Sequence, residues 1–303
     1  MNLRRIEAFL AVAEAGNISR ASAQLEVAQS VVSRHVKALE AELGYGLFER
    51  TGRGVALTPA GRLLAPRLRS SLAEMQRAAI EAGELGDQPH GLVRVGVVPA
   101  AIWPLVGLLY QRVAERFPRV RLHFVEGFGN ALEEPLTRGE LDLAVINRYG
   151  RLHHHGEERL CTVDSLVVGP PGAFGKHTRE LAFKSLAELP LVLASKPNGL
   201  RVALDQVCRR TGVQLRVAAE ADSMLTMKAL VLQGGLHTVL PRQLVHEDLA
   251  QGAMSAVRLV KPSVPRTLSL ATSSHHPGTL ATRAVWREIR DIVANTLVHT
   301  VWR

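Results

Sequence analysis

The sequence predicts an α/β protein with an N-terminal winged helix-turn-helix, a long linker helix and a C-terminal domain of two α/β lobes. Two observations predict this architecture. Residues 17–61 have the pattern of two short helices at a tight turn, a β-hairpin and a new helix start. From Gly91 onward, buried strands alternate with helices, which is typical of parallel sheets with crossover helices. With 303 residues, the chain is long enough for two or three domains.

The first three helices follow from the spacing of apolar residues. The spacing predicts a helix over about 3–15, which Gly16 can end. Ser19 can cap a second helix, and a turn at 27–28 separates it from a third. The third helix ends at Gly44, and its apolar face consists of Val32, Val36, Leu39 and Leu43. This pattern predicts a small helical bundle.

A wing and a long helix follow the bundle. Two short strands, at 47–49 and 55–57, flank the glycine-containing loop RTGRG. Thr58 can then cap a helix that has Pro59 as its first residue. This helix is expected to continue to the GDQPHG segment at 86–91. A helix of about 28 residues with no domain around it suggests packing against a second copy. We therefore assign 1–58 to the winged domain and 59–88 to a dimerisation helix.

The C-terminal domain is expected to consist of two hinged lobes. Strands are predicted at 92–98, 120–127, 141–146, 165–170, 189–195, 213–220, 237–241, 256–260 and 267–272. Helices are predicted at 102–116, 129–138, 199–212, 223–233 and 277–299. Chain crossings near 163 and 265 would divide 91–303 into one lobe of about 91–163 with 266–303 and another of about 164–265. A cleft between the lobes would be the expected result.

Composition excludes a membrane-spanning protein but does not by itself indicate a DNA-binding one. No apolar run approaches the length that spans a bilayer. The net charge is +9, yet residues 1–90 hold 11 Lys and Arg against 10 Asp and Glu. The excess positive charge therefore lies outside the expected DNA-binding part, and the argument for DNA has to come from local placement. Cys161 and Cys208 lie far apart in sequence, which favours reduced thiols and a cytoplasmic location.

The outward face of the third helix has the side chains that recognise bases in the major groove. Arg can bond to guanine O6 and N7 together, Gln to adenine, and Ser to a base or a phosphate, while Val31 could pack against a thymine methyl group. Arg50 and Arg53 in the wing would contact phosphates or the minor groove. The candidate DNA-binding residues are Ser19, Arg20, Gln29, Ser30, Val31, Ser33, Arg34, Lys37, Arg50 and Arg53. The alternative is an ordinary solvated face, but the wing and the Thr58–Pro59 helix start favour the winged domain.

Ligand-binding residues are expected where strands end in the hinged lobes. Ligands of such domains bind beyond the carboxyl ends of strands, near the free N–H groups of helix starts. The candidate positions are Pro99, Ala100, Ala101, Ser195, Pro197, Asn198, Gly199, Asp222, Ser223 and Thr238. Ordinary loop residues after buried strands are the alternative interpretation of each one.

We expect no catalytic or metal site. His153, His154 and His155 are adjacent, and adjacent histidines in a loop have poor geometry for a closed metal site. The sequence has no CxxC, HExxH, GxSxG or phosphate-loop pattern. Nothing next to Cys161 or Cys208 argues for a reactive thiol, so both are interpreted as structural.

The chain resembles the LysR-type transcriptional regulators. The matching segments are LRRIEAFLAVAEAGNISRAS, AQSVVSRHVKALEAELG and LFERTGRGVALTPAG, followed by EGFGNALEEPLTRGELDLAVI and the VLP element at 239–241. SKPNGLR at 195–201 is similar to the nitrogen-assimilation-control branch of that family. The resemblance implies an effector domain like the periplasmic binding proteins. It also implies a dimer, usually doubled to a tetramer, on an interrupted palindrome.

Two departures from the family pattern stand out. The family usually has proline where this chain has Ser30, and we expect Ser30 to cap the third helix and to contact phosphate. The family commonly holds an effector carboxylate with a Ser or Thr where this chain has Ala100 and Ala101. A hydroxyl contact is lost there, which argues against a simple carboxylate effector.

The prediction is therefore a sequence-specific transcriptional regulator that a small-molecule effector controls, with no enzymatic activity. Expected partners are double-stranded DNA, the effector, further copies of the chain and RNA polymerase. One alternative is an enzyme or solute-binding protein with a DNA-binding appendage, for which Asp222 with Lys196 is the candidate pair. Another is a chromosome-architectural protein that binds DNA without sequence preference.

Overall fold

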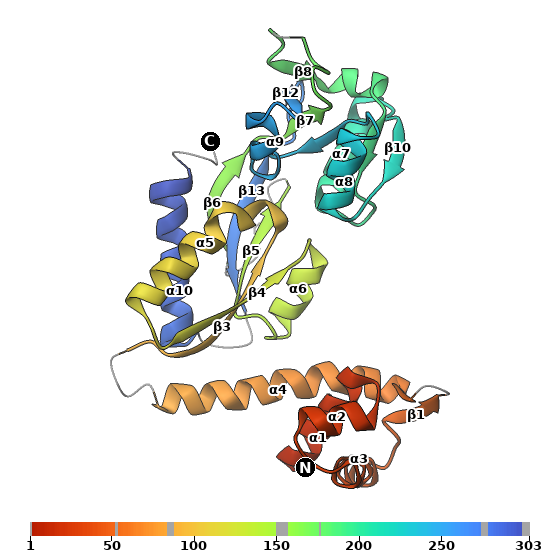
Figure 1. Cartoon of the computed structure of the whole chain (residues 1–303), viewed down its shortest axis with the longest axis vertical. Coiled ribbons are helices and arrows are strands. Elements are labelled where there is room, and N and C mark those ends of the chain that lie inside the picture. The colour runs from red at the N-terminus through yellow and green to blue at the C-terminus, as the bar shows by residue number, and fades with distance from the viewer. Residues whose placement is uncertain are drawn as a thin grey trace. The chain divides into compact units, whose positions relative to one another are not determined.

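The computed structural model describes residues 2–51, 54–83, 88–149, 157–175, 177–273 and 278–298. The chain forms two compact units, divided near residue 83 (Figure 1). In the described part of the chain, none of the helices has the length and apolar character needed to cross a bilayer.

The first unit contains the three expected helices, α1 (Leu3–Ala15), α2 (Ile18–Gln24) and α3 (Gln29–Leu43). Gly16 and Gly44 end α1 and α3 in the left-handed region, with φ of 62° and 82°, as their positions predicted. The expectation that Ser19 caps α2 is wrong. The cap is Asn17, whose side chain accepts a hydrogen bond of 2.7 Å from the Ser19 backbone N–H. Asn is as good a cap as Ser, and α2 begins at Ile18, whereas a helix capped by Ser19 would begin at Arg20.

The wing is an antiparallel hairpin of β1 (Phe48–Thr51) and β2 (Gly54–Leu57), with Phe48 opposite Leu57. Glu40 of α3 positions its first strand, because Oε1 accepts hydrogen bonds from the backbone N–H groups of Leu47 (2.6 Å) and Phe48 (3.2 Å). The Val55 N–H donates to the Gly16 carbonyl oxygen at 3.0 Å, which joins the second strand to the end of α1.

The long helix α4 (Pro59–Gly83) follows the wing. Thr58 caps it as expected, since its hydroxyl accepts from the Gly61 N–H at 3.1 Å and donates to the Gly46 carbonyl at 2.9 Å. A side chain at Gly61 is excluded, because a Cβ there would lie 2.3 Å from the Leu47 carbonyl oxygen. The helix has 25 residues to Gly83, and the next residues of the predicted helix, 84–87, lie outside the described part of the chain.

Two apolar clusters hold the first unit together. Phe9, Leu39 and Leu47 are fully buried in one that also reaches Ala65 and Leu68 of α4. The other joins α1, α2 and α3 and contains Ala8, Val12, Ala21, Val32 and Val36. The apolar face predicted for α3 is thus the face that packs, and its opposite face is left for solvent or a ligand.

The second unit begins with a five-stranded sheet in the order β4-β3-β5-β13-β6. Its strands are β3 (Gly91–Val97), β4 (Val120–Glu126), β5 (Leu143–Arg148), β6 (Glu157–Val163) and β13 (Arg266–Thr272). Strands β3, β4 and β5 are parallel, as the alternating pattern predicted. Strand β13 runs antiparallel to β5 and to β6, so the sheet is mixed. The prediction had no strand at 157–163.

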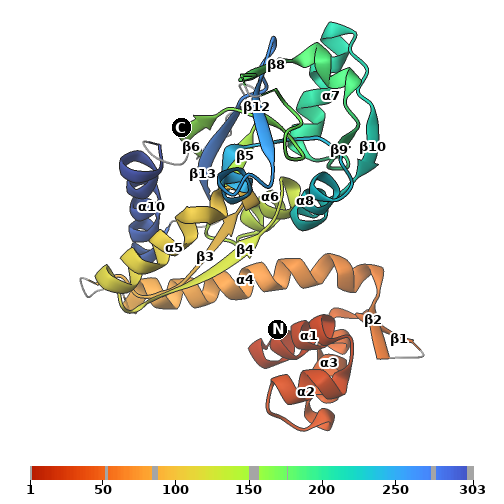
Figure 2. The same ribbon diagram turned by 45° about the horizontal axis from the view of Figure 1, so that its top comes forward.

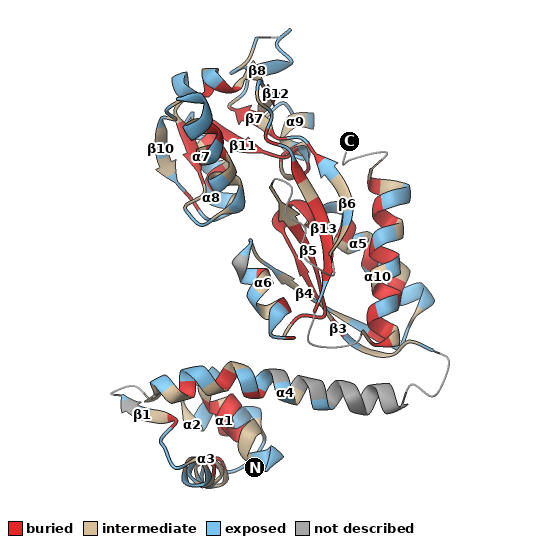
Figure 3. Cartoon of the chain, turned by 180° about the vertical axis from the view of Figure 1, so that it is seen from behind, coloured by how far each residue is buried: buried red, intermediate tan, exposed pale blue. Residues whose placement is uncertain are grey.

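Helices cover both faces of this sheet. Helices α5 (Pro99–Arg116) and α10 (Leu280–Ile292) lie on one side and α6 (Asn130–Thr137) on the other (Figures 1 and 2). A π-helical turn, η3 (Val293–Leu297), extends α10. The central strands β3, β5 and β13 are largely buried (Figure 3). Helix α5 is interrupted at Trp103, where φ is −97° and ψ is 132°, because the residue before a proline is disfavoured in the helical region.

The remaining strands form the second lobe. They are β7 (Leu166–Gly169), β8 (Glu180–Ala182), β9 (Leu191–Leu193), β10 (Val217–Glu220), β11 (Thr238–Leu240) and β12 (Ser255–Val260). One sheet has the order β11-β7-β12-β8, and β9 pairs in parallel with β10. The helical segments are η1 (Phe183–Glu188), α7 (Gly199–Thr211), α8 (Met224–Leu232), η2 (Arg242–Leu244) and α9 (His246–Ala250). The chain enters this lobe after Val163 and leaves it before Arg266.

Candidate functional site

The exposed face of α3 is the candidate nucleic-acid interface of the first unit. Gln29, Ser30, Arg34 and Lys37 are exposed, and Val31 and Ser33 are half-buried. In the described part of the chain, no side-chain hydrogen bond or ion pair engages any of these six residues. Long polar side chains with no partner inside the fold are available to bind a partner outside it.

The start of α3 differs from the expectation in one respect. Its cap residue is Ala28, which makes no side-chain hydrogen bond, and Ser30 is already the second residue of the helix. The expectation that Ser30 caps the helix is therefore wrong, because α3 begins at Gln29, whereas a helix capped by Ser30 would begin at Val31. The first backbone N–H groups of α3 have no capping side chain and can meet an anion such as a phosphate.

The remaining candidate DNA-binding residues lie on two other elements. Ser19 and Arg20 are exposed on α2. Arg50 lies in β1. Arg53 lies outside the described residues.

The second unit has a pocket between its two lobes, of about 790 Å³ including the part open to solvent. Six of the ten candidate ligand-binding residues line it: Ala100, Asn198, Gly199, Asp222, Ser223 and Thr238. Pro99, Ala101, Ser195 and Pro197 are not part of its wall, and Ala101 is fully buried in the core of the first lobe. Most of the remaining wall is apolar: Phe128, Leu193, Ala194, Leu200, Leu204, Ala221, Met224, Met227, Val239, Leu240, Pro241 and Leu244.

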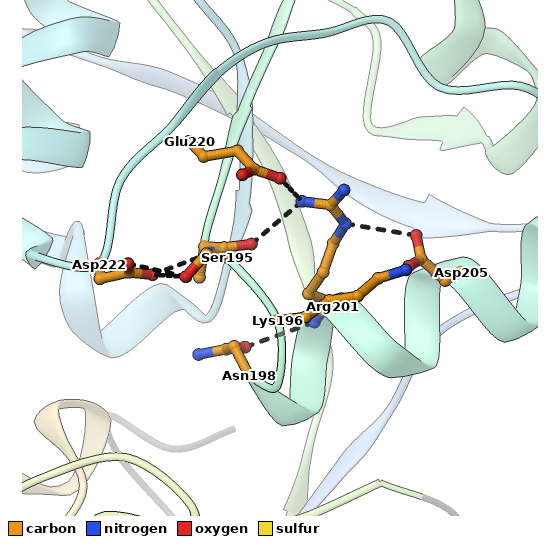
Figure 4. A network of polar contacts seen from close by, with 8 residues as sticks. Ser195, Lys196, Asn198, Arg201, Asp205, Glu220 and Asp222 are labelled. Atoms are coloured by element: carbon orange, nitrogen blue, oxygen red, sulfur yellow. Dashed lines mark hydrogen bonds and ion pairs between the residues drawn. The ribbon is translucent and has the colours of Figure 1, made fainter.

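Hydrogen bonds within the protein already engage several of the predicted polar residues (Figure 4). Asp222 accepts from the Ser195 N–H at 2.8 Å and from the Ser195 hydroxyl at 2.7 Å. These hydrogen bonds hold the pKa of the Asp222 carboxyl below its usual range. Asn198 caps α7, since its Oδ1 accepts from the N–H groups of Leu200 and Arg201. The Thr238 hydroxyl is buried and donates to Met227 Sδ at 3.3 Å.

The candidate enzyme pair is not formed. Lys196 Nζ lies 2.7 Å from Asp205 Oδ2, while Asp222 is bonded to Ser195 (Figure 4). Lys196 and Asp222 thus have separate partners, and the alternative of an acid–base pair in the cleft loses its candidate residues.

Sequence reasoning missed two arginines in the pocket wall. Arg201 of α7 is held by two carboxylates: its Nη1 lies 2.6 Å from Glu220 Oε1 and its Nε lies 3.3 Å from Asp205 Oδ1. Arg266, the first residue of β13, is 2% exposed. Its position next to the predicted chain crossing near 265 is the only sequence signal that placed it at the cleft.

Tyr149 is a third residue that the sequence did not indicate. It follows β5 of the first lobe, lines the pocket, and packs against the core of the second lobe. A Cβ added at Gly199 would lie 3.1 Å from Tyr149 Cδ2, so the glycine allows the tyrosine ring to approach the start of α7. Trp103 of α5 and His246 of α9 also meet across the lobes, with ring centroids 3.6 Å apart.

The thiols lie outside the pocket wall. Burial raises the pKa of the Cys161 thiol to about 11 and also raises that of Cys208. The structure contains no group of three possible metal ligands among the residues it describes. His153, His154 and His155 lie outside the described residues.

Comparisons with known protein families match both units. Residues 3–62 match the family described as bacterial regulatory helix-turn-helix protein, lysR family. Residues 86–294 match the family described as LysR substrate binding domain. Together these segments span nearly the whole chain.

Relatives that match most of the chain include regulators named for different roles. The nitrogen assimilation regulatory protein nac of Escherichia coli is 29% identical over 89% of this chain and 88% of that protein. A probable hydrogen peroxide-inducible genes activator of Streptomyces viridosporus is 33% identical over 89% of this chain and 87% of that one. The chain is about equally similar to both, so identity alone does not assign it to a branch.

Solved structures show the same fold. A full-length OxyR variant from Pseudomonas aeruginosa has a TM-score of 0.71 and 22% identity, and covers 97% of this chain and 95% of its own. CbnR in complex with its target DNA has a TM-score of 0.70 and 20% identity, and the match covers 97% of this chain and 99% of the CbnR chain. At these identities the likeness supports the architecture and not the individual contacts.

Proposed function

The chain belongs to the LysR family of bacterial transcriptional regulators, and from this premise we propose that α3 reads duplex DNA and that the pocket between the lobes binds the controlling effector. Regulators of this type join a DNA-binding helix-turn-helix to an effector-binding domain, and both segments match here. The relatives are transcriptional regulators. Since the protein acts on DNA, we also propose that it works in the cytoplasm.

The observation that carries the DNA proposal is the two-sided character of α3. Its apolar side is buried against α1 and α2, and its other side presents Gln29, Ser30, Arg34 and Lys37 without partners in the described structure. We assign base contacts to Gln29, Val31 and Arg34, because their side chains match adenine, the thymine methyl group and guanine. Ser30, Ser33 and Lys37 are assigned to bases or phosphates.

The neighbouring elements are assigned to the DNA backbone. Ser19 and Arg20 of α2 are exposed and would contact phosphates. Arg50 of β1 and Arg53 stay predicted contacts of the wing. Backbone contacts of this kind position the reading helix and make binding dependent on salt.

We propose that α4 joins two copies of the chain. Leu63 and Met75 of this helix expose 60% and 57% of their surface, and an apolar partner surface would bury both. A second copy would cover them and place two reading helices in successive major grooves, roughly 10 bp apart. A tetramer and contacts with RNA polymerase stay predictions from the family.

The coupling of the two units is proposed as a population shift. A ligand that fits the pocket better when the lobes are closed favours that state, and the packing of subunits on DNA changes with it. DNase footprints of the full-length protein with and without a pocket ligand test this coupling. We expect the ligand to alter the footprint, and identical footprints would refute the coupling.

Genomic DNA retained by the purified full-length protein tests the DNA proposal. Sequencing of the retained fragments should return a small set of sites, and anisotropy titrations then measure affinity for the best one. Arg34→Ala should weaken binding by roughly 1–3 kcal/mol, because a forked base contact is lost. Arg4→Ala removes the same charge from the exposed start of α1 and should change affinity little. Equal effects of the two variants would remove Arg34 from the reading set.

A further inference from the structure

The two arginines of the pocket differ in how their charges are balanced. Arg201 makes hydrogen-bonded ion pairs with Glu220 and Asp205, and it also donates to the Ala194 carbonyl at 3.1 Å. Arg266 donates to Gln243 Oε1 at 3.1 Å and to the Tyr149 hydroxyl, both of which are neutral groups. One arginine is therefore neutralised within the protein and the other is not.

The lack of a carboxylate partner matters at Arg266 because the side chain is buried. In the described part of the chain, the titratable groups that influence its charge are the Tyr149 hydroxyl and the Cys161 thiol. Burial raises the pKa of both, so neither carries a negative charge at neutral pH. A buried guanidinium without a carboxylate is costly, since it has lost water and gained no opposite charge. Burial accordingly lowers the pKa of Arg266.

Some buried hydrogen-bonding groups of Arg266, of Gln243 beside it and of Asn147 in the same pocket wall have no partner among the described residues. Within the described ranges, Arg266 Nε and Gln243 Nε2 are buried donors without a partner, and Asn147 Oδ1 is a buried acceptor without one. Gln243 is 3% exposed and contacts Arg266 directly, while Asn147 and Arg266 both line the pocket. Buried donors are normally paired, so a buried cation that lines the pocket and keeps an unpaired Nε–H is complementary to an oxyanion.

The rest of the wall restricts what can carry that oxyanion. Leu193, Leu204, Met227 and Val239 belong to the apolar majority of the lining. Asp222 adds one negative charge, which repels a second acidic group on the ligand. An inorganic anion would leave the apolar wall uncovered, whereas an organic acid with one carboxylate would cover it.

We propose that the pocket binds an apolar monocarboxylate whose carboxylate pairs with Arg266 at the start of β13. The assignment rests on the proposed effector function of the same pocket. It moves the anion contact away from Ala100 and Ala101, where the sequence lacks the hydroxyl that the family uses. Because β13 pairs with both β5 and β6 of the first lobe and begins where the chain returns from the second, a ligand on Arg266 lies beside the hinge.

The experiment compares matched acids and amides on the full-length protein. The probes are benzoate and benzamide, phenylacetate and phenylacetamide, and hexanoate and hexanamide, with inorganic sulfate as a further anion. Titration calorimetry and thermal shift measure binding directly, without a DNA readout. We expect at least one acid to bind at least about tenfold more tightly than its amide, and sulfate to bind weakly.

Two variants identify the residue responsible. Arg266→Met should remove the preference for the acid, leaving affinity for the amide unchanged or higher. Arg258→Met is the matched control, since Arg258 is an exposed arginine of β12 that pairs with Glu180 outside the pocket, and it should keep the preference. If Arg266→Met does not fold, Arg266→Gln keeps a polar side chain at this position without the charge, and it should likewise remove the preference for the acid.

Three outcomes would overturn the assignment: equal binding of acids and amides, no binding of any acid in the panel, or a preference that survives in Arg266→Met. Equal binding would leave the pocket as an effector site and reject only the role of Arg266. Binding to genomic fragments is measured separately, so a failure here does not depend on the DNA proposal and does not decide it.

Discussion

The reading face of α3 and the pocket between the lobes present their polar groups in opposite ways. On α3, Gln29, Arg34 and Lys37 are exposed and have no partner in the described structure. In the pocket, Ser195 and Asp222 are bonded to each other and Asn198 is used as a helix cap. A surface that meets a long charged partner can keep its side chains free. A pocket that must also hold two lobes together uses most of its polar groups for structure, and the few left over point to the ligand.

The largest expected effects come from core substitutions that destabilise one domain and leave the other folded. Leu39 and Leu204 are both fully buried, the first in the core of the winged domain and the second in that of the second lobe. Each leucine-to-alanine change should destabilise its own domain by about 2–5 kcal/mol, because it leaves a cavity. Calorimetric scans with DNA and ligand titrations should show that Leu39→Ala affects DNA binding and Leu204→Ala ligand binding. A single transition that moves equally in both variants would show that the domains do not unfold independently.

Alanine substitutions at Gly61 and Gly107 test the same comparison with smaller expected effects on stability. A Cβ at Gly61 would clash with the Leu47 carbonyl oxygen, while one at Gly107 would meet nothing within 4 Å. Gly61→Ala should destabilise the winged domain by about 1–3 kcal/mol through this overpacking. Gly107→Ala lies inside α5 and should stabilise the second unit by about 0.5–1 kcal/mol, since alanine favours helices. Thermal unfolding measures both, and a neutral Gly61→Ala would contradict the tight turn between wing and α4.

The second unit should lose stability in mild acid. Burial lowers the pKa of His237, which packs against Gly169 and the edge of Phe174. The neutral imidazole is therefore favoured in the fold, and its stabilising contribution is present above the unfolded pKa of about 6.5. That contribution is lost as pH falls through the folded value. Unfolding scans from pH 7.5 to 5.5 should show a decline that His237→Gln reduces, and equal slopes in the two proteins would reject the assignment.

No effect is expected from peroxide. Several relatives are named probable hydrogen peroxide-inducible genes activators. In this chain burial raises the pKa of both Cys161 and Cys208, so the reactive thiolate is scarce at neutral pH. DNA affinity should be unchanged after exposure to micromolar hydrogen peroxide, with the double variant Cys161→Ser and Cys208→Ser as the control. A peroxide-dependent change that the double variant abolishes would show a thiol sensor.

The first unit was predictable because its signals are local. The apolar spacing of α3, the glycines after α1 and α3, and the Thr58 cap of α4 each act within a few residues of the sequence. The errors were also local and small. Asn17 caps α2 in place of Ser19, because two polar residues close in sequence compete for that role. Helix α3 begins after Ala28 without a side-chain cap, where Ser30 was expected to provide one.

The second unit was predictable in its parallel strands but not in its pairing. Strands β6 and β8 are mostly half-exposed, so they lack the apolar run that reveals β3 or β5. The antiparallel return of β13 depends on contacts between segments more than a hundred residues apart. In the pocket, too, local patterns were predictable and contacts between distant segments were not. Asp222 and Asn198 were expected because they follow the ends of strands. Arg266 became a candidate ligand contact only when the structure placed it, buried and without a carboxylate partner among the described residues, in the pocket wall.

In vitro selection from random duplexes tests the central claim most directly. We expect the full-length protein to enrich a two-fold-symmetric site with half-sites about one helical turn apart. Arg34→Ala should enrich the same site with relaxed preference at one base pair of each half, while Arg4→Ala leaves the site unchanged. A wild-type protein that enriches no sequence, or an Arg34→Ala variant that selects an identical site, would contradict the reading role of α3.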